Sequence, residues 1–445
     1  MRKLFWMILF PLMALGTTVS AQSRGGYFFG NSLLRGKLNP AFAPMTDYAS
    51  LPGAGSLSMD MASNVGLEHF IFPENGTGRL FLEDAVPAGT FLAKLPARDP
   101  YLRERVESDL FGYGMKMGKN GYATLSLSVV EDGDVVISND LLRFAKAGSG
   151  AAPASFEGGS GALSGYAALA AGYSLDLGSL AAGLRAGVRV KLLLGLAAGQ
   201  FAVDRMGMQS GPDRISASVH GTGMLAGIGY DASKGFSLSG AGSHGSGAAI
   251  DLGVSYRIPL DGPWALSGIE LSASVCDLGG LTYRSGVSKL SMDHQFAFSG
   301  VGNLAGDVKA EFQQAVDDLM AFTEVDSSPG KSFLHRLPAS VHAGASASLW
   351  RDKANVGLLY YHAVGHDNLM ASGGVSPLPW LNLGVNWTFL GPATRLGCYA
   401  EFIPKKYLGV FVGTERASLR RSGSHIPIRN FTGSFAFGVN VLFGK

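Results

Sequence analysis

The feature that most constrains this chain is a two-residue alternation of side-chain type in the stretch between residues 164 and 193. In its second half the apolar set is Leu184, Ala186, Val188, Val190 and Leu192, and the intervening set is Gly183, Arg185, Gly187, Arg189 and Lys191. Side chains of a β-strand alternate between its two faces, so one face here is apolar and the other carries glycine and cations. With a turn predicted at residues 176–179, the stretch predicts an antiparallel hairpin. Such a hairpin suits a lipid-facing barrel wall, and it also suits a soluble β-sandwich.

Composition favours the barrel. Only 16% of the residues are charged and the mean hydropathy is +0.19, while glycine accounts for 63 of 445 residues. After the N-terminus no run of 18 apolar residues occurs, so no transmembrane helix is predicted. A closed barrel is the remaining way to place this much apolar surface in lipid, which tolerates no open sheet edge. The net charge of +2 gives no reason to expect nucleic acid as a partner.

The N-terminus predicts export. Arg2 and Lys3 precede an apolar run over residues 4–15, and Val19-Ser20-Ala21 offers small residues at the cleavage positions. Residues 1–21 are therefore predicted to be a signal peptide that is cleaved after Ala21. The expected destination is the outer membrane of a Gram-negative bacterium, with membrane lipid and the barrel assembly machinery as partners.

The mature chain divides into a short leading segment and one barrel. Residues 22–52 are predicted to be a partial plug, because residues 39–44 read Asn-Pro-Ala-Phe-Ala-Pro and are rigid and turn-prone. A plain surface loop is the alternative for these residues. Residues 53–445 predict an all-β fold: a transmembrane antiparallel up-and-down β-barrel of about 14 strands, with short helices in loops.

Two helices are expected outside the strands. Asp99-Pro100 has the form of an N-cap followed by an N1 proline, and it predicts a short helix over residues 101–110. Apolar residues on one helical face predict a helical loop insertion near residues 303–330. Aromatic residues near predicted strand ends suit the interfacial girdles of a membrane barrel: Trp350, Tyr360, Trp380, Trp387 and Phe389.

The best functional candidates are charged residues on the polar strand faces. The predicted lumen-lining residues are Arg185, Arg189, Lys191, Asp251, Arg257 and Glu401. If the cations are unpaired, they set a positive field that favours anions or acidic head groups. The alternative is internal salt bridging to carboxylates such as Asp251 or Glu401, and the sequence leaves both open.

No motif points to enzyme chemistry, so no catalytic, metal-binding or cofactor-binding residue is predicted. The chain has no nucleophile elbow, no phosphate-binding loop and no dinucleotide fingerprint. His362 and His366 have no third metal ligand at a recognised spacing. Cys276 and Cys398 fall in different predicted strands, and two unpaired thiols are expected rather than a disulfide.

Several short motifs resemble an uncharacterised Bacteroidetes family of outer-membrane barrels that carries a domain of unknown function. They are Asn39-Pro40-Ala41-Phe42, Gly172-Tyr173-Ser174, the run from Gly187 to Leu192, the run from Asp251 to Tyr256, Asp277-Leu278-Gly279, Leu337-Pro338 and Gly438-Val439-Asn440. The Asn-Pro-Ala start is also similar to FadL-like transporters and to PorP/SprF-like barrels of gliding and type IX secretion. The FadL likeness implies, together with the polar, basic lumen face, a passive channel or transporter for small or hydrophobic solutes, and the cations of that face add an anionic small solute as a possible cargo. The PorP/SprF likeness implies a structural component of a secretion or surface-attachment complex, and a barrel enzyme is a third alternative.

Overall fold

The computed structural model describes residues 24–443, apart from residues 31, 45, 75–76, 84, 148–154, 211–214, 232–234, 239–241, 261–265, 299–325, 364, 392–393, 405–406 and 417–431. The signal peptide predicted over residues 1–21 lies outside the described residues. So does most of the helical insertion predicted near residues 303–330, although residues 326–329 are described and form a short strand.

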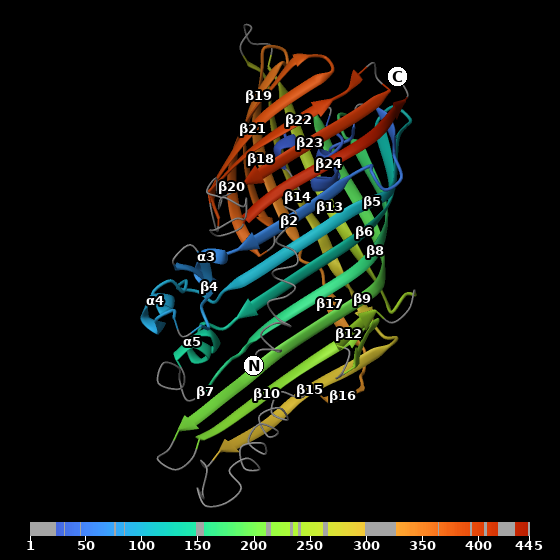
Figure 1. The fold of residues 1–445 in the computed structure, drawn as a ribbon. Helices are drawn as coiled ribbons and strands as arrows, with labels where there is room; N and C mark the ends of the chain where they lie inside the picture. Colours follow the sequence, from blue (N-terminus) through green and yellow to red (C-terminus); the bar gives the residue numbers. More distant parts are fainter. Residues whose placement is uncertain are drawn as a thin grey trace, which may run out of the picture.

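The chain folds into a closed antiparallel barrel of 14 strands (Figure 1). In order round the ring they are β1 (Asp47–Ser50) together with β2 (Leu57–Ser63), β5 (Tyr101–Met117), β6 (Gly121–Ile137), β8 (Gly159–Asp176), β9 (Leu184–Ser210), β13 (Gly245–Pro259), β14 (Leu266–Tyr283), β18 (Ser340–Leu349), β19 (Ala354–Ala363), β20 (His366–Leu378), β21 (Leu381–Leu390), β22 (Arg395–Phe402), β23 (Leu408–Arg416) and β24 (Thr432–Phe443). Strands β1 and β2 share one position, since both pair with β5 and β24, and this pairing closes the ring.

One side of the wall is taller than the other. Strand β9 has 27 residues, against 10 in β18 and β19. Residues 184–195 of β9 pair with β13, and residues 198–210 pair with β10 (Ile215–Ala226). The sheet continues from β10 to β15 (Val287–Phe298) and β16 (Asp326–Pro329), while β7 (Ser155–Phe156) pairs with β9 and β17 (Phe333–Arg336) pairs with β14. The wall therefore branches along β9 and extends beyond the ring on this side, towards the bottom of Figure 1.

The two ends of the barrel differ in their connections. At one end the strands are joined by short turns, such as residues 118–120, 177–183 and 350–353. The other end carries long connections with α3 (Leu67–Phe70), β3 (Ile71–Glu74), β4 (Thr77–Leu80), α4 (Ala88–Leu92), α5 (Asn139–Ala147), β11 (Ile228–Asp231) and β12 (Gly235–Leu238). A small apolar cluster packs the connection between β2 and β5 against α5; it consists of Phe72, Phe81, Val86, Phe91 and Leu142. Outer-membrane barrels keep short turns on the periplasmic side, so the long-loop end is the external one.

The alternation seen in the sequence separates the two faces of the wall. Val190 is 48% exposed on the outer face of β9, whereas the side chain of Lys191 beside it is 14% exposed on the inner face. Large apolar side chains cover the outside of nearly every strand, including Leu169, Leu252, Leu271, Leu358, Val385 and Leu396. Trp350 and Trp380 lie at the short-turn end, and Trp387 and Phe389 lie towards the other end of β21, as interfacial girdles require. None of the helices in the described part of the chain combines the length and hydropathy of a membrane span.

Substituting Val188 with arginine should test the orientation of this wall. A cation on the lipid face of a barrel costs about 2–4 kcal/mol at mid-membrane depth. Val188 is 37% exposed on the outer face, so Val188→Arg is expected to lower the yield of heat-modifiable, folded barrel, while Val188→Leu leaves it unchanged. A cysteine at position 188 should react with a lipid-phase probe, and one at position 189 should not. The opposite labelling pattern would reverse the faces assigned here.

Two expectations from the sequence are corrected. Residues 101–110 form the first part of β5 and not a helix. Arg103, Arg105, Glu107 and Asp109 recur every second residue on its inner face, a strand period that the N-cap pattern of Asp99-Pro100 obscured. The barrel wall also begins with β1, inside the segment of residues 22–52 that was assigned to the plug.

Candidate functional site

The N-terminal segment, residues 24–46, lies inside the barrel, and we call it the plug. It contains a 3₁₀ turn, η2 (Arg24–Gly26), and one turn of helix, α2 (Arg35–Leu38). Its aromatic side chains are almost wholly buried against the inner wall, with Tyr27 and Phe28 packed near Leu359 and Phe29 packed near Tyr399. The plug thus behaves as part of the core.

Three residues of the plug, Leu38, Asn39 and Ala41, form hydrogen bonds with strands β8, β13 and β14 of the wall. The Ser174 hydroxyl of β8 donates to the Ala41 carbonyl at 2.8 Å, and the Ser274 hydroxyl of β14 donates to the Leu38 carbonyl at 2.6 Å. Between them, the Asn39 amide donates at 3.2 Å to two wall carbonyls, those of Val254 on β13 and Ala273 on β14. Its own oxygen accepts from the Ala41 N–H at 2.9 Å, which fixes the turn that Pro40 begins.

Two wall glycines make room for this turn. Gly187 and Gly253 are directly opposite each other on β9 and β13. A β-carbon at Gly187 would lie 2.1 Å from the Pro40 carbonyl oxygen, and one at Gly253 would lie 2.0 Å from the Asn39 side-chain oxygen. Real side chains do not approach so closely, so both positions require glycine as long as the plug is seated.

Ion pairs hold the plug at three further points. Arg24 pairs with Asp60 of β2 at 3.0 Å, and Arg35 pairs with Glu270 of β14. Lys37 contacts two carboxylates of β5, Glu107 at 3.0 Å and Asp109 at 2.7 Å. Arg189 of β9 also donates to the carbonyl of Gly36 at 2.6 Å.

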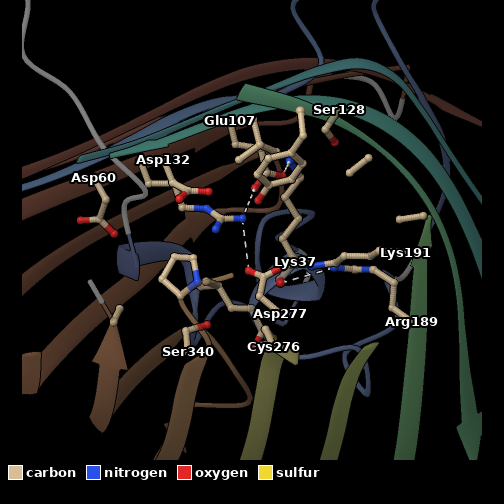
Figure 2. Close-up of a pocket in the computed structure, with 18 of the residues that line it drawn as sticks. Lys37, Asp60, Glu107, Ser128, Asp132, Arg189, Lys191, Cys276, Asp277 and Ser340 are labelled. Carbon is tan, nitrogen blue, oxygen red and sulfur yellow. Dashed lines mark hydrogen bonds and ion pairs between the residues drawn. The ribbon is translucent and has the colours of Figure 1, made fainter. Parts of the chain in front are cut away.

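Beyond Lys37 the charges form one continuous chain across the interior, and Figure 2 shows the part that lines the chamber, including Lys37, Glu107, Asp277 and Lys191. Arg105 lies 3.7 Å from Glu107 and 3.2 Å from Asp277, and Lys191 lies 2.6 Å from Asp277 and 2.9 Å from Asp251. Arg189 completes it, 3.4 Å from Asp251. We call this the ion chain: Asp109, Lys37, Glu107, Arg105, Asp277, Lys191, Asp251 and Arg189. Its four cations and four carboxylates alternate, so it carries no net charge.

A β-bulge places two of the carboxylates. The register of β13 and β14 shifts between Ile250 and Leu252, so Cys276 and Asp277 lie opposite the single residue Asp251. Asp277 has φ +62°, and its N–H donates to the Asp251 carboxylate at 2.7 Å. Bulges re-aim side chains in this way, and here both carboxylates reach the ion chain.

The structure brings together three of the six residues predicted to line the lumen. Arg189, Lys191 and Asp251 belong to the ion chain, in the internal salt bridging that was one of the two alternatives. The other three lie apart from it. Arg185 is near the short-turn end, 3.7 Å from Asp176, and Arg257 pairs with Asp352 at 2.8 Å at the rim. Glu401 is buried on β22 and accepts a hydrogen bond from Asn382 at 2.9 Å.

The sequence analysis did not identify the other residues of the ion chain as members of a site. Arg105, Glu107 and Asp109 were assigned to a helix, although their two-residue spacing could have revealed a strand face. Asp277 appeared only as part of a short motif, and Lys37 has no local pattern that marks it. The two cysteines are free, with Cys276 buried beside the Leu38 carbonyl at 3.4 Å and Cys398 exposed. In the described residues no group of His, Cys, Asp and Glu has the arrangement of a metal site.

A chamber of about 320 Å³ lies between the plug and the long-loop end. Arg24, Lys37 and Leu38 of the plug line one part of it, and Arg103, His335, Arg336 and Gly365 line it towards the loops. Its lining has seven basic side chains (Arg24, Lys37, Arg103, Arg105, Arg189, Lys191 and Arg336) and seven acidic ones (Asp60, Glu104, Glu107, Asp109, Asp132, Asp134 and Asp277). The chamber is therefore highly polar yet balanced in charge.

Comparison with known proteins gives structural likeness at low sequence identity. A Pseudomonas aeruginosa FadL homologue is 12% identical, with 96% of this chain and 98% of that chain covered and a TM-score of 0.43. The Ralstonia pickettii toluene transporter TbuX is 11% identical, with 96% and 95% covered and a TM-score of 0.38. The translocator domain of the autotransporter NalP from Neisseria meningitidis is 10% identical, with 90% and 89% covered and a TM-score of 0.31. No curated protein matches the sequence. The model of DUF5723, a family of unknown function, matches residues 40–414, and the chain belongs to that family.

Proposed function

We propose that this protein is an outer-membrane channel that its own N-terminal plug keeps closed, and that a small polar solute passes when the plug shifts. The observation that carries the proposal is the polar chamber on the long-loop side, which ends on the plug. The apolar outer face of the closed wall supports a location in the membrane, because a barrel has no open sheet edge to satisfy in lipid.

The chemistry of the interior supports a polar solute over a hydrophobic one. Charged side chains surround the chamber. Transferring an apolar molecule from lipid into contact with these side chains would give no gain in free energy. Arg189 and Lys191 of β9 are already paired with carboxylates, so they supply no open positive field for a simple anion. The proposed cargo is therefore polar and close to neutral overall.

Movement of the plug is consistent with how it is held. Hydrogen bonds and ion pairs attach it to the wall, and the described part of the plug has no disulfide. Such contacts can exchange for contacts with water or solute, which would have to compensate the carboxylates of Glu107 and Asp109 when Lys37 leaves. In this proposal the plug is the bistable element that gating requires.

Replacing Asn39 with alanine should open the channel more often. The change removes both amide contacts to Val254 and Ala273 and the turn contact to Ala41, each worth about 0.5–1.5 kcal/mol. In planar-bilayer recordings the wild type is expected to be mostly closed, and Asn39→Ala to show an open probability raised about tenfold or more. Asn64→Ala, which removes amide contacts in an outer loop, is the control and should match the wild type.

The competing function is a structural component of a secretion or surface-attachment complex. This function predicts no conductance in planar-bilayer recordings, either for the wild type or for Asn39→Ala. It also predicts that affinity pulldown from membranes retains a specific protein. That combination would replace the channel proposal.

A further inference from the structure

We infer that acid releases the plug, and that His342 of β18 is the residue whose protonation releases it. The inference rests on the proposed function for its meaning, because it assigns a signal to the movement of the plug. The movement itself can be measured without any conductance.

The ring of His342 is covered by the plug. It is stacked on Tyr27 of the plug, with ring centroids 6.2 Å apart, and on Tyr361 of β19, with ring centroids 6.4 Å apart. The guanidinium of Arg24, which also belongs to the plug, lies 4.2 Å from the centre of the Tyr361 ring. His342 is 1% exposed in this arrangement. Withdrawal of the plug would remove Tyr27 and Arg24 together and expose the imidazole to water.

Neither nitrogen of this imidazole has a hydrogen-bond partner among the residues that the structure describes. A neutral imidazole leaves one donor and one acceptor unsatisfied there, whereas an imidazolium would bury a full charge with no acceptor for either N–H. Burying a charge without a partner costs far more than burying an unpaired polar group. The seated plug therefore favours the neutral form of His342.

The charged groups around the ring do not compensate a proton on it. Four charged or titratable side chains act on the ring from the elements packed against it: Arg24 and Tyr27 of the plug, Tyr361 of β19 and Asp277 of β14. Arg24 carries the same charge as an imidazolium and would repel it. Asp277 would attract it, but its carboxylate is already paired with Arg105 at 3.2 Å and with Lys191 at 2.6 Å. The tyrosine hydroxyls are neutral over the range in which histidine titrates.

Proton linkage sets the direction and size of the effect. An imidazole that is open to water takes up a proton near about pH 6.5. Above that pH His342 is neutral whether the plug is seated or displaced, so the closed state keeps its full stability. Below it the proton binds when the plug has moved, and the ratio of displaced to seated plug rises about tenfold for each pH unit. From about pH 7.5 to about pH 5.0 the expected rise is about 30-fold.

The thiol of Cys276 reports the position of the plug. It is 3.4 Å from the carbonyl of Leu38, and the residue is 4% exposed. A Cys398→Ser background removes the other, exposed thiol. In the purified full chain, the rate at which a disulfide reagent active in acid labels Cys276 then measures displacement of the plug. Because the reactivity of a thiol itself depends on pH, each rate is divided by the rate of a His342→Phe variant at the same pH.

This ratio of labelling rates is expected to rise about 30-fold from about pH 7.5 to about pH 5.0. Phenylalanine keeps an aromatic ring but cannot take up a proton, so the plug of His342→Phe should stay seated at both pH values. His362→Gln is the control, because His362 is a histidine of the adjacent strand whose side chain is 39% exposed and pairs with Asp367. That variant should respond to acid like the wild type. A ratio that does not change with pH would overturn the inference.

Two further variants keep the test decisive. Heat-modifiable migration shows whether His342→Phe folds, and His342→Gln, which is also uncharged, replaces it in the ratio if it does not. His342→Lys introduces a side chain that is charged in water at both pH values and should label rapidly at both. Labelling of His342→Lys as slow as that of the uncharged variants would also contradict the inference.

Failure of this inference and failure of the channel proposal can be told apart. Labelling of Cys276 in acid that depends on His342, without conductance in planar bilayers at the same pH, would keep the proton switch and remove the channel. Conductance of Asn39→Ala together with a constant labelling ratio would keep the channel and remove the switch.

Discussion

Replacing Asp251 with asparagine is expected to destabilise the folded barrel by about 3–5 kcal/mol, because it leaves charged groups buried without their partner. The Asp251 side chain has no exposed surface and contacts both Arg189 at 3.4 Å and Lys191 at 2.9 Å. Asparagine keeps the shape and can still accept the hydrogen bond from the Asp277 N–H, so the change removes mainly the charge. Unfolding in denaturant, with the barrel refolded into lipid vesicles, measures the loss.

Asp176→Asn is the matched control on the same side of the barrel. Asp176 faces another arginine of β9, Arg185, but the pair is 3.7 Å apart and the two side chains are 42% and 31% exposed. Exposed pairs contribute about 0–1 kcal/mol, so this variant should unfold nearly like the wild type. If both variants lost the same free energy of unfolding, burial of the ion chain would not determine how much it contributes to stability.

Replacing both Gly187 and Gly253 with alanine should displace the plug, while the barrel itself remains folded. Each new β-carbon would fall about 2 Å from plug atoms, those of Pro40 and Asn39 respectively. Overpacking of this kind costs about 1–3 kcal/mol for each site, and withdrawal of the plug relieves both. We expect a persistently conducting channel in planar bilayers, with residues 24–46 becoming sensitive to protease.

Gly373→Ala is the control for this pair. Gly373 is in the middle of β20, and a β-carbon there meets nothing within 4 Å. That variant should keep the closed, protease-resistant state. If the double variant also stayed closed and resistant, the plug would not be the element that blocks the barrel.

Much of the wall could be predicted from the sequence, because the information is local. Side chains of a strand alternate with period two, so the runs Leu184 to Leu192 and Phe435 to Phe443 each specify which residues face outwards. A register slip of one residue would move every apolar side chain to the wrong face, which makes the alternation decisive. The exception was β5, where charged side chains occupy every second position on the inner face and the Asp99-Pro100 pair has the form of a helix start.

The abundance of glycine was visible in the composition, but its reason was not. Gly344, Gly357 and Gly374 are on the inner wall where a β-carbon would lie 2.4–2.8 Å from ring atoms of Tyr27, Phe28 or Phe29. These glycines provide space for the aromatic side chains of the plug. Only the folded barrel shows which glycines meet the plug, since the residues concerned are several hundred positions apart in the chain.

The sequence by itself determined a closed wall with an apolar outside and a polar inside, because strand periodicity and the demands of lipid act residue by residue. Tertiary structure alone decided how the polar inside is used. Whether Arg189 and Lys191 would be free or paired depended on the bulge that turns Asp277 inwards and on the plug that brings Lys37 to β5. Partner choice in a barrel is set by ring closure and register between distant strands, and no short stretch of sequence carries that information.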